Sequence, residues 1–274
     1  MLRIVRTIFA VCAVQLFAGC TSFFNSATPA DIKLFSVLLL GEVHDNAEQH
    51  QQRAARFKAL LEAGARPALL LEQFDRERQA DIDKAIVQGK DADALIAAAT
   101  SGTKTGWNWA FYKPFISLAL QYQLPVIAAN VSRSDASRIY TQGLLANGFI
   151  ADIPDDIGKE QTKEILQSHC GLIDNKQAAQ MSNIQVARDQ FMARQIQVYQ
   201  SRGVVLLAGN GHVRKDIGVP RWLPTSVLKN TRAIGYLETL SSTSTTASLP
   251  FDEVITTTEQ KRSDPCESMR QAVK

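Results

Sequence analysis

Carboxylate and imidazole side chains in this sequence follow runs of apolar residues, in positions where they could meet at one site. The set consists of Glu42, His44, Glu72 and His212. These groups are ligands that divalent metals accept, and a bound metal can activate water. The set would therefore permit a metal-dependent hydrolase or protease that uses Mn, Zn or Co. Taken singly, each of these side chains could equally satisfy backbone amides or cap a helix.

An aromatic segment between Trp107 and Phe115 offers a different chemistry. Most of its rings would serve to pack a core. Tyr112 could instead bind ferric iron, because a phenolate is an anionic oxygen ligand that haem iron accepts. The neighbouring Lys113 could meet a haem propionate. The two interpretations of the segment remain open at this point.

Several motifs that would indicate other enzymes are missing. The sequence has no Gly-x-x-x-x-Gly-Lys-Ser/Thr phosphate loop and no His-Glu-x-x-His zinc motif. Gly-x-Gly-x-x-Gly does not follow the first apolar run, which disfavours a nucleotide-cofactor enzyme. Gly-x-Ser-x-Gly is also absent, which disfavours an α/β-hydrolase.

The apolar runs that precede the polar set predict strands buried on both faces. Their ranges are 36–40, 68–71, 125–129 and 204–208, with further strands expected at 232–240 and 254–258. Helical patterns separate most of them, which favours an α/β fold with an open, mainly parallel sheet flanked by helices. Ligands of such sheets bind beyond the carboxyl ends of the strands, where the polar set would lie.

Two stretches do not follow strand–helix alternation. Residues 89–124 and 155–202 are expected to be helical insertions within an α/β domain that covers 34–274, and to form a smaller all-helical lobe. A helix is also expected at 47–63, with Asp45 as its cap.

The N-terminus has the pattern of a lipoprotein signal. Arg3 and Arg6 precede an apolar stretch that is too short to span a membrane, and the stretch ends in Phe17-Ala18-Gly19-Cys20. We therefore expect residues 1–19 to be a removed signal peptide, Cys20 to be lipidated, and 20–33 to be a tether. Because Thr21 rather than Asp follows Cys20, sorting to the outer membrane is expected.

Removal of the signal changes the charge and the cysteine count. The chain carries 30 Lys and Arg against 27 Asp and Glu, but the signal holds Arg3 and Arg6, so residues 20–274 have a net charge of only +1. No nucleic-acid partner is indicated. With Cys12 removed and Cys20 lipidated, Cys170 and Cys266 remain, and we predict a disulfide between them.

An ordered set of segments resembles the ChaN family of bacterial haem-uptake lipoproteins, in the Tiki superfamily. The matching segments are Leu40–Asp45, Leu71–Phe74, Trp107–Pro114, Pro125–Asn130, Arg188–Asp189, Met192–Ala193, Gly209–His212 and Gly218–Pro220. Gln73 departs from the family pattern, in which Met is expected.

The resemblance implies a lipid-anchored binding and transport protein rather than an enzyme. Such a protein would hold ferric haem beside an outer-membrane haem receptor and would form a homodimer on haem binding. It also implies a Tyr ligand to the iron, with a His and a Lys meeting the propionates. Tyr112 lies in the matching segment and is the first choice. The other candidates are Tyr122, Tyr140, Tyr199 and Tyr236 for the ligand, His44, His169 and His212 for the His, and Lys113 and Lys215 for the Lys.

Overall fold

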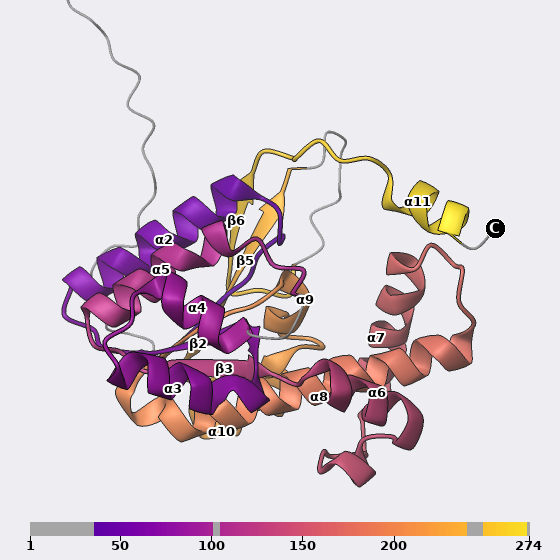
Figure 1. Ribbon diagram of the computed structural model, residues 1–274. Coiled ribbons are helices and arrows are strands. Elements are labelled where there is room, and N and C mark those ends of the chain that lie inside the picture. The colour runs from indigo at the N-terminus through magenta and orange to yellow at the C-terminus, as the bar shows by residue number, and fades with distance from the viewer. Residues whose placement is uncertain (1–35, 101–104, 240–248, 273–274) are drawn as a thin grey trace, which may run out of the picture.

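The computed structural model describes residues 36–100, 105–239 and 249–272. The predicted signal peptide, the Cys20 lipidation site and the tether lie outside these residues. A six-stranded parallel sheet forms the centre of the fold, in the order β3-β2-β4-β1-β5-β6. Its strands are β1 (Val37–Leu40), β2 (Ala68–Asp75), β3 (Val126–Asn130), β4 (Val204–Leu207), β5 (Thr231–Glu238) and β6 (Glu253–Thr257). The predicted α/β class is confirmed (Figure 1).

The central strands lie inside the protein because their side chains alternate between two apolar faces. Leu38 and Leu40 of β1 point into one core cluster, while Val37 and Leu39 point into the other. All four side chains are buried. Because both faces of this strand are buried, its sequence is a continuous apolar run and not an alternation of apolar and polar residues.

Helices from the first half of the chain cover one face of the sheet. They are α2 (Ala47–Glu62), α3 (Gln79–Val87), α4 (Ala92–Thr100) and α5 (Trp109–Gln121). Each of these helices contributes side chains to the core cluster of this face, among them Phe57, Ile82, Leu95 and Phe115. The described parts of the stretch 89–124, which include α4 and α5, thus belong to the main helical layer and not to a second lobe.

The other face is covered by the C-terminal half of α8 (Asn175–Tyr199), by η4 (Val219–Trp222) and by α10 (Thr225–Leu228). Met192 and Ile196 of α8 pack there against Leu39 and Leu70 of the sheet. The C-terminal half of α8 therefore fixes the N-terminal half of the same helix relative to the sheet.

That N-terminal half belongs to a helical lobe at one end of the sheet (Figure 1). The lobe also contains α6 (Arg133–Gln142), η2 (Leu145–Asn147) and α7 (Asp155–Ser168). Ile139, Phe149, Ile157 and Val186 form its own core cluster. The predicted small helical lobe is present, but it is built from residues after β3 only.

Two predicted boundaries differ in detail. The N-cap of α2 is Asn46, whose side chain accepts a hydrogen bond from the Gln49 amide, and not Asp45. Asp45 pairs instead with Arg262. Within the expected helical stretch from residue 89 to residue 124, helix α5 begins only at Trp109, where the Asn108 side chain caps it.

The C-terminal segment after β6 reaches across to the helical lobe. Near its start Arg262 binds Asp45 and Glu238 on the sheet side. At its far end the helix α11 (Pro265–Ala272) carries Cys266, which forms a disulfide with Cys170, the pairing expected from the sequence. We call residues 258–272 the strap. No helix among the described residues is long and apolar enough to span a membrane.

Removing this disulfide should destabilise the protein. Cys170 and Cys266 are 96 residues apart in sequence, so the bond restricts a long loop in the unfolded chain. The double variant Cys170→Ser/Cys266→Ser should lose about 2–4 kcal/mol of unfolding free energy. Urea unfolding under non-reducing conditions measures this loss, with the reduced parent protein as a control. A variant as stable as the oxidised parent would contradict the prediction.

Candidate functional site

A cavity of about 450 Å³ opens between the carboxyl ends of the strands and the helical lobe. On the sheet side it is lined by the predicted polar set and the loop that follows β4. On the lobe side it is lined by α7 and α8. The lining residues used below are Glu42, His44, Glu72, Gly209, His212, Gln185, Arg188 and Arg214. The sheet thus brings together the polar set from three distant parts of the sequence.

Glu42 lies at the centre of a buried network beneath the cavity floor. Its carboxylate binds Arg53 Nη1 and accepts a hydrogen bond of 2.6 Å from the Tyr112 hydroxyl. The side chains of Glu42 and Arg53 are both fully buried. Burial lowers the pKa of Arg53 to about 10, which leaves the guanidinium charged at neutral pH. This cation keeps Glu42 in its ionised form.

His44 connects this network to the cavity. Its Nδ1 lies 2.8 Å from Glu42 Oε1, and about half of the side chain is exposed. Burial is the main cause that lowers the pKa of His44 below 6.5. The Nε2 side of the ring faces Gly209, where an added Cβ would lie 3.3 Å from Nε2. A side chain at position 209 would therefore crowd the His44 ring, and glycine allows the close approach.

His212 is held between two carboxylates. Its Nδ1 lies 2.6 Å from Asp189 Oδ1, and its Nε2 lies 3.5 Å from Glu72 Oε1. Glu72 also accepts a 2.8 Å hydrogen bond from the Gly209 amide. Burial alone would lower the pKa of His212, but Glu72 and Asp189 raise it to about 10. His212 is thus an imidazolium at neutral pH, and its charge helps to lower the pKa of Glu72 to about 2 against the effect of burial.

Stability should fall at alkaline pH because of His212. The folded pKa of about 10 lies above the ordinary value of 6.5. The stabilisation from the charged ring is therefore complete below pH 6.5 and is lost as the pH rises towards 10. We expect the parent protein to lose on the order of a few kcal/mol of unfolding free energy between pH 7 and 10. His212→Asn, measured by urea unfolding over the same range, should show a much flatter profile. Equal slopes for the two proteins would refute this assignment.

Two arginines of the cavity differ in their partners. Arg214 forms ion pairs with Glu160, Glu164 and Asp216. Arg188 forms no ion pair among the described residues. Its Nη1 donates to the amide oxygen of Gln185, and its buried Nε has no hydrogen-bond partner. Arg188 is therefore the cavity cation whose charge is available to a ligand.

The polar set does not form a metal site. Across residues 36–100, 105–239 and 249–272, no group of three or more His, Cys, Asp or Glu side chains is placed to hold a metal ion. Glu42 is bound by Arg53 and Tyr112, and His212 by Asp189. The alternative expectation of a divalent metal on Glu42, His44, Glu72 and His212 does not fit this arrangement.

Tyr112 does not offer its hydroxyl to haem. The side chain is fully buried, and the hydroxyl is bonded to Glu42. Burial raises the pKa of Tyr112 above its ordinary value, whereas ligation of iron requires the phenolate. The first choice of ligand is therefore wrong for this structure, and Tyr112 instead orients Glu42.

The other tyrosines have different environments. Tyr236 is fully buried. Tyr122 lies under the Arg66 guanidinium, and Tyr199 packs against the core beside α8. Tyr140 is half-buried on α6 of the helical lobe.

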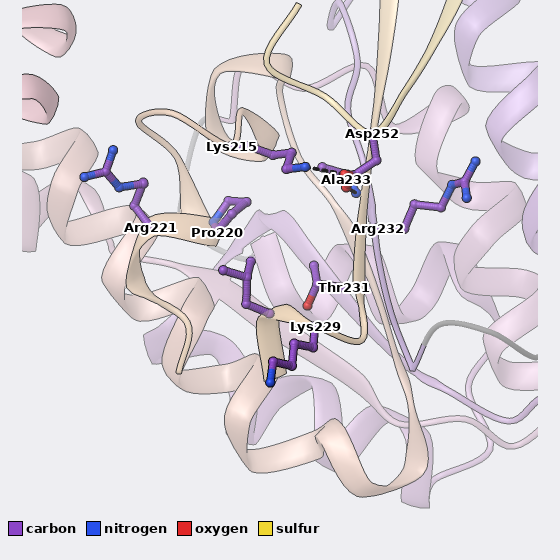
Figure 2. A pocket seen from close by; sticks show the side chains of 9 residues that line it. Lys215, Pro220, Arg221, Lys229, Thr231, Arg232, Ala233 and Asp252 are labelled. Carbon is purple, nitrogen blue, oxygen red and sulfur yellow. Dashed lines mark hydrogen bonds and ion pairs between the residues drawn. The ribbon is translucent and has the colours of Figure 1, made fainter. Parts of the chain in front are cut away.

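The remaining expected haem contacts are dispersed. Lys113 is paired with Asp93 on the main helical layer. His169 ends α7, with its Nδ1 2.8 Å from the Ile165 carbonyl oxygen. Lys215 lies in a separate hollow of about 560 Å³ beside β5, where it pairs with Asp252 (Figure 2). Neither lysine lines the cavity at the carboxyl edge.

Four residues of the site carry no role in the sequence-based prediction. His50 and Arg53 lie on α2, about one and two turns after its cap, and both are buried. His50 stacks on Phe111 and binds the His44 carbonyl oxygen. In the sequence, Asp189 and Arg188 stand out only because they belong to a segment that resembles the ChaN family. The signal for Arg53 was its place on the apolar face of the helix, where a lone cation needs a buried acid.

A family model covers most of the chain. The model described as "Haem-binding uptake, Tiki superfamily, ChaN" matches residues 30–223. This span includes β1 to β4, the helical lobe and every residue of the cavity discussed above. No curated protein matches the chain.

The chain is similar to several solved structures, to different degrees. The ChaN protein of Campylobacter jejuni, described with cofacial haem binding, is 23% identical, with a TM-score of 0.64. The match covers 79% of this chain and 86% of that one. An erythromycin esterase mutant, EreC, is more remote, with 12% identity over 76% of this chain and 71% of that chain and a TM-score of 0.46. The type III effector HopBA1 has 14% identity over 85% and 94% of the two chains and a TM-score of 0.45.

Proposed function

Since the chain belongs to the ChaN family of haem-binding uptake proteins in the Tiki superfamily, we propose that it binds ferric haem through a tyrosine of the helical lobe. The observation that carries the proposal is the family match over residues 30–223. The fold shared with the ChaN protein of Campylobacter jejuni, which binds haem cofacially, supports it. Cofacial binding would place two copies of this chain around two haem groups.

Tyr140 is the ligand that we propose. A haem ligand needs an accessible phenol next to an apolar surface, because the porphyrin is flat and largely apolar. Tyr140 is half-buried near the end of α6, and α6 packs against η2. Leu145 of η2 is 77% exposed, and Ile150, which follows it, is 55% exposed. These side chains offer an apolar surface on the same lobe as the phenol.

The cellular role that we propose follows the same family. Lipidation at Cys20 would hold the protein on the outer membrane, beside a haem receptor. The helical lobe would hold haem without chemical turnover and pass it on. A phenolate ligand favours ferric over ferrous iron, so reduction would promote release of the haem.

Titration with hemin tests this proposal. The apo protein, as residues 20–274 with Ser in place of Cys20, should give a saturable Soret band and a high-spin ferric spectrum. Sedimentation on the same samples should show a shift from monomer to dimer as hemin is added. Absence of saturable binding would overturn the haem function, while binding without dimerisation would overturn only the cofacial arrangement.

A further inference from the structure

We propose that the cavity at the carboxyl edge of the sheet hydrolyses small uncharged carboxylic esters without a metal, with His44 as the general base. The inference is independent of haem binding, because it uses the cavity residues and not the exposed face of the helical lobe. It rests on three features of the cavity: the fixed orientation of the His44 imidazole, the availability of the Arg188 guanidinium, and the absence of a surplus of positive charge.

The orientation of His44 follows from the buried network. Glu42 is ionised beside Arg53, so it can only accept a hydrogen bond from His44 Nδ1. The Nδ1 atom therefore carries the proton, and Nε2 carries the lone pair. The ring that carries this lone pair is about half exposed and lines the cavity, so a water molecule can reach it from there. A carboxylate behind an imidazole is the arrangement that holds a general base in its working tautomer.

The groups around His44 keep it neutral. Glu72 and Asp45 favour its protonated form, while burial, His212 and Arg188 oppose it, and the pKa falls below 6.5. At neutral pH the ring is therefore able to take a proton from water.

Arg188 supplies the charge that the reaction needs. When water attacks an ester carbonyl, negative charge develops on the carbonyl oxygen, and cationic donors stabilise it. Arg188 lines the cavity, its buried Nε has no partner, and it forms no ion pair among the described residues. The proposed binding of haem does not involve this guanidinium.

The chemical step is complete with these groups and water. The water oxygen attacks the carbonyl carbon, the π electrons move to the carbonyl oxygen, and His44 Nε2 takes the water proton. Collapse of the tetrahedral intermediate breaks the bond to the alkoxy oxygen, which leaves with that electron pair and takes the proton back from Nε2. The products are an alcohol and a carboxylic acid, which releases its own proton to solvent.

The charge of the cavity selects the substrate class. His212 pairs with Glu72 and Asp189, and Arg214 is already bound by three acids, so Arg188 is the cavity cation left for a ligand. A phosphoester or a polyanion would meet Glu72 without a surplus of cations to bind it. A volume of about 450 Å³ suits a small molecule rather than a folded peptide chain.

Hydrolysis of p-nitrophenyl butyrate by protein dialysed against EDTA tests the proposal. The parent should show saturable turnover above the buffer rate. His44→Asn should lower kcat at least 100-fold, as expected for loss of a general base. Arg188→Met should lower kcat about 100-fold through loss of oxyanion stabilisation. Lys159→Gln, exposed at the start of α7, should behave as the parent does.

Circular dichroism and melting of each variant would show that it is folded. Folded His44→Asn protein with the parental rate would overturn the assignment of the base. Parent protein no faster than buffer would overturn the activity. Turnover that disappears with EDTA and returns with added Mn, Zn or Co would overturn the metal-free reaction.

Discussion

Replacing Tyr140 with Phe should reduce hemin affinity at least about 100-fold, equivalent to about 2.7 kcal/mol, and abolish the high-spin ferric spectrum. The variant removes only the hydroxyl oxygen that would bind iron, and it leaves the ring in place on α6. Absorbance titration of the apo protein measures both the affinity and the spectrum. The fold should be unaffected, because the Tyr140 side chain is only half-buried.

Tyr112→Phe is the matched control for this experiment. Its hydroxyl is bonded to Glu42 in the core, so its loss should leave the hemin spectrum unchanged while it lowers stability by about 1–3 kcal/mol. Tyr122→Phe and Tyr199→Phe should also bind hemin as the parent does. If Tyr112→Phe were the variant that lost hemin, the buried arrangement would have to open on binding, and our choice of Tyr140 would be wrong.

Arg53→Met should produce the largest loss of stability, about 3–5 kcal/mol. Methionine is long enough to fill most of the space, but it leaves the buried Glu42 carboxylate without its cation. The free energy of unfolding from urea denaturation measures the loss.

Lys58→Met on the same helix is the control. Lys58 forms an exposed i,i+4 ion pair with Glu62, and such pairs contribute less than about 1 kcal/mol. The double variant Arg53→Met/Glu42→Gln should recover part of the loss, since the buried charge is gone. A loss for Arg53→Met no greater than that for Lys58→Met would show that the pair is not the buried charge centre described above.

The sequence predicts the sheet well because its strands are buried on both faces. Uninterrupted apolar runs such as 36–40 and 204–208 have few alternatives in a chain of this size. The same logic placed Glu42, His44, Glu72 and His212 at one edge, and the structure does bring them to one cavity. The order of elements in the sequence does not determine whether a helix covers the sheet or joins the helical lobe. The position of α4 and α5 on the sheet could therefore not be predicted.

The failure at Tyr112 has a different physical cause. The sequence allows Tyr112 either to pack in the core or to bind iron, but Asn108 caps a helix there in which Tyr112 and Phe115 are both buried. Whether a tyrosine is accessible depends on the rotation of its helix against the sheet, which a single sequence does not determine. Arg53 was missed for a related reason, because its buried partner lies eleven residues earlier on another element.

The strap bears on how the protein is made. Arg262 attaches it to Asp45, next to His44, and Cys266 attaches it to Cys170, two residues beyond the cavity-lining Ser168. Both attachments come from residues that leave the ribosome after all of the cavity residues. The two walls of the cavity can therefore be tied together only after all of the cavity residues have been synthesised, and a chain truncated before residue 258 would carry every cavity residue yet leave its walls untied.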